Sequence, residues 1–327
     1  MSSESCPKWY DELNHSDWEK RFLAAKKASS EHARIEWENF SEEKRKCMSA
    51  KVVSLLDDPH SRVRAQIASA IANLKIQEGK DALVAALADP NEWVRVQVTE
   101  ALGQVGDPEL AQVVAGHLQD EQESHVKATL VKILGCIGDE KMLPVLALYL
   151  EDPDSRVRAN CVEALSRLKL GKAELKESML KLVNDPSNRV RANIALVLVS
   201  IGEGKGREIL EEMLISSDEY MRASALYALG ELNCSDDCGR IIHFFDDESW
   251  LVRKNAVRAI VKHGKKAGQV LSGALKSQNF QARLCALDAF GSIRDVSIRT
   301  AVIELLDDEV GEVRSKAEEL LDILNGY

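Results

Sequence analysis

The chain repeats one pattern of nearly constant length. The stretch DPDSRVRANCVEAL at residues 152–165 returns as DPSNRVRANIALVL at residues 185–198. When each copy is aligned on the apolar residue before an Arg or Lys, successive copies lie 30 to 33 residues apart. A catalytic site needs its special residues once, whereas a stacked structural unit needs its core residues in every copy. The aligned anchor residues are Val63, Val94, Val126, Val157, Val190, Met221, Val252, Ala282 and Val313.

Each copy predicts two α-helices. Apolar residues follow the anchor at the spacing of one helix face, as Ile67, Ala70, Ile71 and Leu74 do in the first copy. An Asp-Pro or acidic turn comes before the anchor, and we expect its Asp to cap the helix N-terminus. A second apolar segment, such as KDALVAALA, fills the rest of the copy. We therefore expect two antiparallel helices per copy, A followed by B, with the anchor on B. Neither helix buries its apolar face alone, so neighbouring pairs should stack into an all-α solenoid.

The motif D-P-x-x-x-V-R-x-x-A/V-x-x-A-L resembles HEAT repeats, in particular the short kind shared with phycobilin lyases. The resemblance covers residues 46–327 as one continuous array of nine repeats. It implies an α-solenoid, a right-handed superhelix of stacked antiparallel helix pairs. Residues 1–45 depart from the motif: residues 17–28 resemble a degenerate B helix, and a charged segment follows. We expect this region to be an N-terminal helical cap that closes the stack.

Composition narrows the classes of function. The chain has 43 basic and 53 acidic residues and a net charge of −10, which disfavours a protein that coats nucleic acid. No apolar run is long enough to span a bilayer, and the polar N-terminus shows no secretory signal. Seven scattered cysteines do not form a disulfide framework. We expect a cytoplasmic protein that does not bind a membrane.

A basic residue follows the anchor in every copy, and an acidic residue recurs in the turn before it. This Arg row could bind an anionic ligand. Alternatively, it pairs with the recurring Asp and ties neighbouring turns together, which we favour because a feature of every copy is more often architectural. The expected structural Asp/Arg ladder comprises Asp58, Arg64, Asp89, Arg95, Asp152, Arg158, Asp185 and Arg191.

Two other rows vary from copy to copy, one residue before and six residues after the anchor. In HEAT-like arrays the B helices line the concave surface, and the resemblance implies that both rows face it. Trp, Tyr and Arg are the residue types enriched at binding hot spots. Scattered surface aromatics are the alternative explanation. The candidate partner-binding residues on this face are Trp93, Arg156, Arg189, Tyr220 and Tyr227, with Trp250 as a near neighbour.

We find no catalytic motif and expect no cofactor. Cys234, Cys238 and His243 offer only three local ligands, without a second Cys pair at zinc-site spacing, so we predict no metal site. We therefore predict a non-catalytic scaffold or adaptor that binds another protein on its concave B-helix surface. Two alternatives stay open. One is a chromophore-handling enzyme similar to phycobilin lyases. The other is a HEAT-like nucleic-acid-binding protein, which Arg62, Arg156, Arg158, Arg189 and Arg191 would serve.

Overall fold

The computed structural model describes residues 6–294 and 298–325. Residues 1–5, 295–297 and 326–327, which belong to the predicted cap and array, lie outside the described residues. The chain forms two compact units, Met1–Gly171 and Lys172–Tyr327. Where the chain is described, its regular structure is helical, and no helix is both long and apolar enough to cross a membrane.

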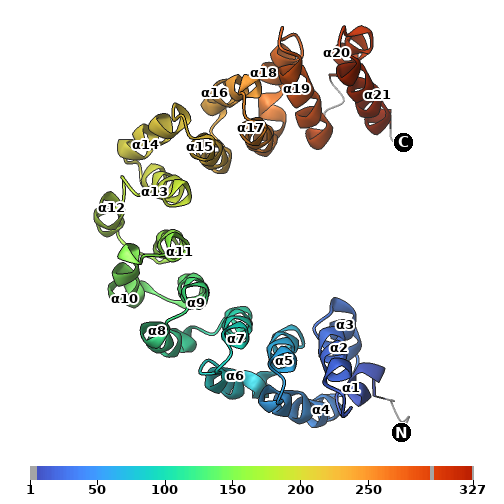
Figure 1. Cartoon of the computed structure of the whole chain (residues 1–327), viewed down its shortest axis with the longest axis vertical. Helices are drawn as coiled ribbons and strands as arrows, with labels where there is room; N and C mark the ends of the chain where they lie inside the picture. Colours follow the sequence, from blue (N-terminus) through green and yellow to red (C-terminus); the bar gives the residue numbers. More distant parts are fainter. Residues whose placement is uncertain (1–5, 295–297, 326–327) are drawn as a thin grey trace. The chain divides into compact units, whose positions relative to one another are not determined.

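Unit 1 is a stack of helix pairs in two layers (Figure 1). The B helices α5, α7, α9 and α11 pack side by side in sequence order, and α2 packs on α5 and extends this layer. The A helices α4, α6, α8 and α10 form the second layer. The helices are α1 (Lys8–Glu12), α2 (Trp18–Ala28), α3 (Glu31–Glu38), α4 (Glu42–Ser54), α5 (Ser61–Asn73), α6 (Lys80–Ala86), α7 (Glu92–Val105), α8 (Ala111–Asp120), α9 (Ser124–Ile137), α10 (Leu143–Leu148) and α11 (Ser155–Arg167).

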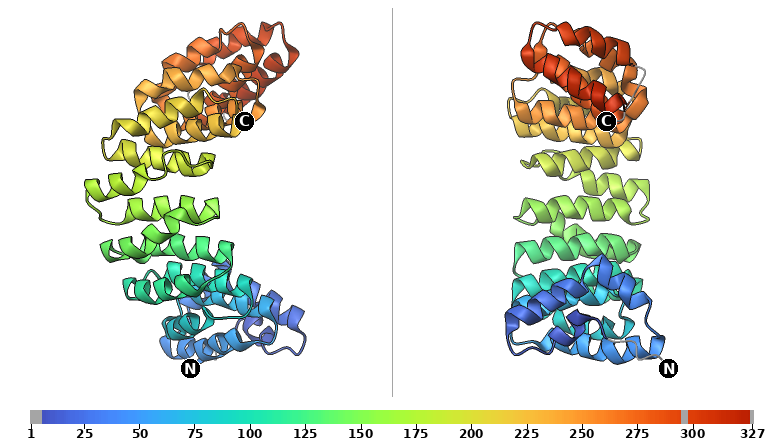
Figure 2. Two further views of the ribbon diagram at one scale, coloured as in Figure 1. Left: turned by 60° about the vertical axis from the view of Figure 1, so that its left-hand side comes forward. Right: turned by 90° about the vertical axis from the view of Figure 1, so that its right-hand side faces the viewer.

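Unit 2 repeats this arrangement, and Figure 2 shows its helix pairs stacked one on another. The B helices α13, α15, α17, α19 and α21 pack on one another in sequence order. Each B helix follows an A helix of the same repeat. The helices are α12 (Lys172–Leu180), α13 (Asn188–Ser200), α14 (Gly204–Leu214), α15 (Glu219–Leu232), α16 (Cys238–His243), α17 (Trp250–His263), α18 (Gly268–Ala274), α19 (Phe280–Ile293), α20 (Arg299–Glu304) and α21 (Gly311–Asn325).

The B helices begin later than the sequence predicts. Our expectation that the Asp of the Asp-Pro turn caps the helix is wrong. In the first repeat, Asp58 follows a short 3-10 helix (Leu55–Asp57), and the N-cap residue of α5 is His60. The Asp58 carboxylate instead accepts a hydrogen bond from the backbone N–H of His60 at 2.9 Å. The Asp side chain therefore closes the turn between the A and B helices, which sets the angle at which α5 enters the stack.

The anchor rows form the core of each unit. The residues four, seven and eight positions after the anchor are buried in repeat after repeat, for example Ile67, Ala70 and Ile71 in α5. The anchors are buried too, except Met221, which is half-buried. One face of each B helix therefore packs inward along its whole length, and its opposite face stays exposed to solvent.

Glycine lets two pairs of B helices approach closely. A Cβ added to Gly230 of α15 would lie 2.8 Å from the Cα of Ala259 in α17. A Cβ added to Gly135 of α9 would lie 2.5 Å from the Cα of Ala164 in α11. Since backbone atoms cannot move aside as a flexible side chain can, these helix pairs are in contact along their backbones.

We expect Gly230→Ala to lower the free energy of unfolding by about 1–3 kcal/mol, because the added methyl overlaps the backbone of α17. The measurement is chemical denaturation followed by circular dichroism. The matched control is Gly116→Ala in α8, where an added Cβ meets no atom within 4 Å. The control should stabilise the protein by up to about 1 kcal/mol, because Ala favours a helix over Gly. A stabilised Gly230→Ala variant would disprove the close contact.

Candidate functional site

Arginines bridge successive repeats, and two of them, Arg64 and Arg95, belong to the predicted ladder. The Arg64 guanidinium donates to both carboxylate oxygens of Asp89 in the next repeat, with Nε–Oδ2 and Nη2–Oδ1 distances of 2.7 and 2.9 Å. Arg95 contacts Glu121 in the same way, and Arg21 of α2 contacts Asp58. Arg222 and Arg283 bind carboxylates of the following repeats. These partners are Asp247 and Asp308.

Each bridge also holds the turn of its own repeat. The second amino group of Arg64 donates to the backbone carbonyl of Asp58, at 2.8 Å, so one guanidinium joins two turns. Burial alone would raise the pKa of the Asp58 carboxyl, but the hydrogen bonds from Arg21 and from the His60 amide outweigh it and lower the pKa. The same balance lowers the pKa of Glu121 and of Asp308. These carboxylates are therefore ionised and engaged within the stack.

The remaining ladder residues vary in their contacts. Lys127 replaces Arg in the third repeat, and its amino group lies 3.9 Å from the buried carboxylate of Asp152. Arg158 donates to the Asp152 carbonyl at 2.8 Å. Asp185 is buried and accepts from the Ser187 amide at 2.8 Å.

Two arginines of unit 2 do not bind a carboxylate in the next turn, because Ser occupies the position of the acidic residue there. Where Ser216 stands, Arg191 donates to Glu212 of α14 instead, at 2.8 Å, and its buried Nε has no hydrogen-bond partner. Where Ser277 stands, Arg253 donates only to the backbone carbonyls of Asp247 and Glu248 within the described residues. At the α13–α15 and α17–α19 joints, no carboxylate therefore stands at the position that receives the Arg in other repeats.

In unit 1, the exposed face of the B layer carries two of the predicted binding residues. Trp93 at the start of α7 is exposed, and the centre of its ring lies 5.1 Å from the centre of the His125 ring of α9. Arg156 at the start of α11 is also exposed, but its guanidinium binds Asp154, with an Nη2–Oδ2 distance of 2.6 Å. This hydrogen bond lowers the pKa of Asp154 to about 2. Arg156 is therefore already paired with the Asp154 carboxylate on the surface.

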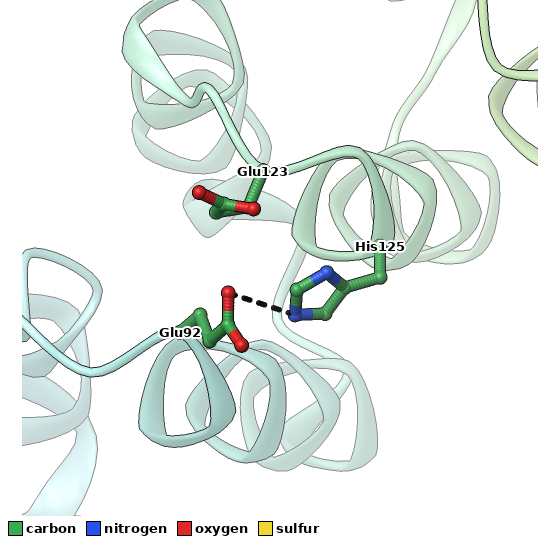
Figure 3. Close-up of side chains that lie close together, drawn as sticks. All are labelled: Glu92, Glu123 and His125. Atoms are coloured by element: carbon green, nitrogen blue, oxygen red, sulfur yellow. Dashed lines mark ion pairs between the residues drawn. The ribbon is translucent and has the colours of Figure 1, made fainter.

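Beside Trp93, the structure brings together Glu92, Glu123 and His125, a group that the sequence did not reveal (Figure 3). One ligand atom of each residue lies within 4.8 Å of the others. The buried Nε2 of His125 has no hydrogen-bond partner and lies 3.7 Å from a carboxylate oxygen of Glu92. The residues come from the starts of α7 and α9, which are consecutive B helices.

Two carboxylates and an imidazole could in principle hold a divalent cation such as Zn²⁺ or Mn²⁺. However, the residues stand at the N-terminal ends of two helices, where the helix dipoles favour negative charge and oppose a bound cation. A protonated His125 would pair with Glu92 across the same 3.7 Å gap without a metal. The group is therefore an inter-repeat polar contact in our interpretation, and it assigns no metal.

Unit 2 gathers the other four predicted binding residues on its B layer. Arg189 is exposed at the start of α13. Tyr220 and Tyr227 both project from α15, and Trp250 is the first residue of α17. These three aromatic side chains expose between 50% and 63% of their surface. Three large rings are therefore exposed to solvent on two helices that pack on each other.

The structure adds a basic stripe on α17 that the sequence analysis missed. Trp250, Lys254, Arg258 and Lys262 are the exposed residues of this helix and follow one another every four positions. The Lys254 amino group lies 4.5 Å from the centre of the Trp250 ring, and that of Lys262 lies 5.2 Å from the centre of the Tyr227 ring. The four-residue period was the available signal, but Lys254 stands two positions after the anchor, outside the two rows we considered.

The cysteine group lies elsewhere in unit 2. Cys238 is buried at the start of α16, and burial raises the pKa of its thiol. Cys234 is half-buried and His243 is exposed. They do not form a metal-binding group in the part of the chain that the structure describes.

A model of HEAT repeats matches residues 49–134, 120–177, 169–230 and 239–322. The chain belongs to the HEAT-repeat family. The HEAT-repeat prediction and the prediction of stacked, all-α helix pairs are thus confirmed. No curated protein sequence matches the chain.

The solved structures that are similar to it include an engineered protein and a lyase complex. An engineered protein is 18% identical with a TM-score of 0.40, over 97% of this chain and 98% of that one. The complex of CpcE and CpcF of phycocyanin lyase from Nostoc sp. PCC7120 is 17% identical with a TM-score of 0.46, over 99% of this chain and 98% of that one. At these scores the likeness does not extend to function.

We expect the free energy of unfolding to fall as the pH drops below about 4. The lowered pKa values of Asp58, Glu121 and Asp308 mean that the unfolded chain takes up protons first. Their contribution to stability is therefore present above the unfolded pKa and is lost as the pH falls through the folded pKa. Urea denaturation at neutral pH and at about pH 3 measures this loss.

Glu121→Gln should cost about 1–3 kcal/mol at neutral pH, because it removes the charge that Arg95 binds in a largely buried place. It should also weaken the dependence of stability on pH. Glu140→Gln removes an equal charge from an exposed position and should change stability by less than about 0.5 kcal/mol. Equal losses in both variants would show that the bridge does not stabilise the stack.

Proposed function

We propose that this protein is a scaffold or adaptor that binds another protein on the exposed face of its B-helix layer. The observation that carries the proposal is the presence of exposed aromatic rings on consecutive B helices, above all Tyr220, Tyr227 and Trp250. Single exposed apolar residues are normal on protein surfaces, but clustered aromatics mark interaction sites. Unit 1 has its own candidate binding residues on its B layer, Trp93 of α7 and Arg156 of α11.

The stack supports such a role because it holds the exposed rows at fixed spacing. Buried anchor rows and inter-repeat bridges place the aromatic side chains before a partner arrives, which limits the conformational entropy lost on binding. Aromatic residues and Arg in this setting typically supply most of an interface's binding energy. Such binding needs no chemical step, so we propose a non-catalytic role without a cofactor.

We further propose that the protein acts in the cytoplasm. Its seven cysteines are all free thiols, and Cys47 and Cys136 are exposed. Free thiols persist in the reducing cytoplasm, whereas exported proteins tend to form disulfides. A chromophore-handling role, or binding of nucleic acid, would be the alternative. A bilin and a DNA duplex are therefore probes to include beside the protein partner.

The first test is capture of a partner from lysate of the source organism by the purified protein, followed by measurement of the affinity for the purified partner. We expect the combined variant Trp93→Ala, Tyr220→Ala, Tyr227→Ala and Trp250→Ala to lose the partner. Truncation of a single hot-spot residue typically costs about 2 kcal/mol or more of binding free energy. Circular dichroism checks that the variant remains helical.

The matched control removes exposed apolar side chains from the other layer. Leu148 of α10 and Ile215 after α14 expose 71% and 85% of their surface, more than any of the aromatic residues tested. The variant Leu148→Ala, Ile215→Ala should keep the partner. Loss in the control alone would move the interface to the A layer. A bilin or a DNA duplex bound in place of any protein would contradict the scaffold proposal.

A further inference from the structure

Four side chains of α17 and two of α15 are exposed on the B layer of unit 2. Tyr220 and Tyr227 of α15 lie beside the exposed residues of α17, which are Trp250, Lys254, Arg258 and Lys262. We call these six residues the α15–α17 surface. From Trp250 to Lys262 the stripe is about 18 Å long, at the helical rise of about 1.5 Å per residue. This length matches a short linear segment of a partner.

The register of the two helices is fixed at both ends. The Ser249 hydroxyl donates a hydrogen bond to Glu219 near the helix starts, and Lys262 forms an ion pair with Glu231 near the helix ends. Tyr227 stands four residues before Glu231, and Arg258 stands four residues before Lys262. These two side chains therefore occupy equivalent positions on neighbouring helices. A carboxylate that reaches Arg258 would lie next to the Tyr227 ring.

The surface carries positive charge that the chain itself does not neutralise. Within the described residues, Lys254 and Arg258 make no ion pair, although both are exposed. Lys254 contacts only the face of Trp250, an interaction that leaves its hydrogen-bond donors open to an incoming anion. The exception among the cations of the stripe is Lys262, which pairs with Glu231. In a chain of net charge −10, a basic and aromatic surface of this kind is a local reversal of charge.

Charge around the surface limits what it can bind. On the next B helices, exposed acidic residues replace the cations: Asp288 on α19, then Glu312 and Glu319 on α21. Lys316 pairs with two of them, Asp288 and Glu319, so the negative charge there exceeds the positive. A long polyanion such as nucleic acid would cross from two unpaired cations onto repelling carboxylates. Tight nucleic-acid binding typically neutralises about six to ten phosphates, more than this surface offers.

The platform beneath the surface is a helix pair joined by both an ion pair and a close backbone contact. Arg222 binds both carboxylate oxygens of Asp247 across the pair, at 2.8 and 2.9 Å. The close approach of Gly230 to Ala259 brings the two backbones into contact. The spacing between the tyrosines and the basic stripe is therefore set before binding. Pre-arranged side chains lose little entropy when a ligand is bound.

We infer that the α15–α17 surface binds an acidic linear segment of a partner protein. The inference rests on the proposed scaffold function and adds the chemistry of the partner. Carboxylates of the segment bind Lys254 and Arg258, and its apolar side chains pack on Tyr220, Tyr227 and Trp250. Both halves of the surface are used, because the rings provide apolar contact and the cations select for charge.

The probe for the test is a fluorescent peptide of about twelve residues, rich in Glu and Asp with a few Leu, which is long enough to cover the stripe. A second, neutral peptide has Gln and Asn in place of the acidic residues, and a third probe is single-stranded oligothymidine. Fluorescence anisotropy measures binding to the full chain. We expect the acidic peptide to bind, the neutral peptide to bind at least about tenfold more weakly, and added salt to weaken binding.

The decisive variant is Lys254→Glu, Arg258→Glu, which should weaken binding of the acidic peptide by about tenfold or more. Lys265→Glu, Lys266→Glu changes the net charge equally at exposed positions outside the surface and should stay within about twofold of wild type. Trp250→Ala should weaken the binding of both peptides, because it removes apolar contact. Equal losses in the two charge-reversed variants would overturn the inference, as would equal binding of the acidic and neutral peptides.

The remaining outcomes separate the inference from the proposed function. If oligothymidine binds more tightly than the acidic peptide, and the Lys254→Glu, Arg258→Glu variant loses it, the surface is a nucleic-acid site and the inference fails. If a captured partner depends on Tyr220 and Trp250 but is insensitive to Lys254→Glu, Arg258→Glu, the scaffold function stands and the acidic segment is wrong. Loss of both partner and acidic peptide in this variant, with the control intact, supports both.

Discussion

The contact between neighbouring repeats is the constraint on which the rest of the structure depends. A single helix pair of this length cannot bury its apolar face, so each repeat is stable only against the next one. Apolar rows such as Ile67, Ala70 and Ile71 provide the burial. The bridges from Arg to the next carboxylate add direction, because a guanidinium bound at two oxygens and a carbonyl sets both distance and orientation.

Each B helix therefore has two faces with different constraints on their side chains. One face is committed to packing and repeats nearly the same residues in each copy, whereas the opposite face is free to vary. Variation there does not disturb the stack, which explains why Tyr227 and Arg258 can occupy equivalent positions on neighbouring helices. Residues that differ between copies of a repeated pattern are therefore better guides to function than those that recur.

The sequence predicted the helix pairs well because the period and the apolar spacing reflect local geometry and burial together. It placed Trp93, Tyr220, Tyr227 and Trp250 in exposed positions of the B helices, although their binding role stays a prediction. It did not predict that Asp58 closes a turn, since the short 3-10 helix before it has no clear sequence signal. Nor could it reveal the contact of Glu92 with His125, which depends on how far two separate helices are offset.

The serines at positions 216 and 277 interrupt the row of bridges in unit 2. Arg222 binds Asp247 between α15 and α17, and Arg283 binds Asp308 between α19 and α21. At the α13–α15 and α17–α19 joints, no carboxylate stands at the position that would receive the Arg. We therefore expect unit 2 to bend more readily at these two joints than within the α15–α17 pair. Such bending would leave the distances within that pair unchanged.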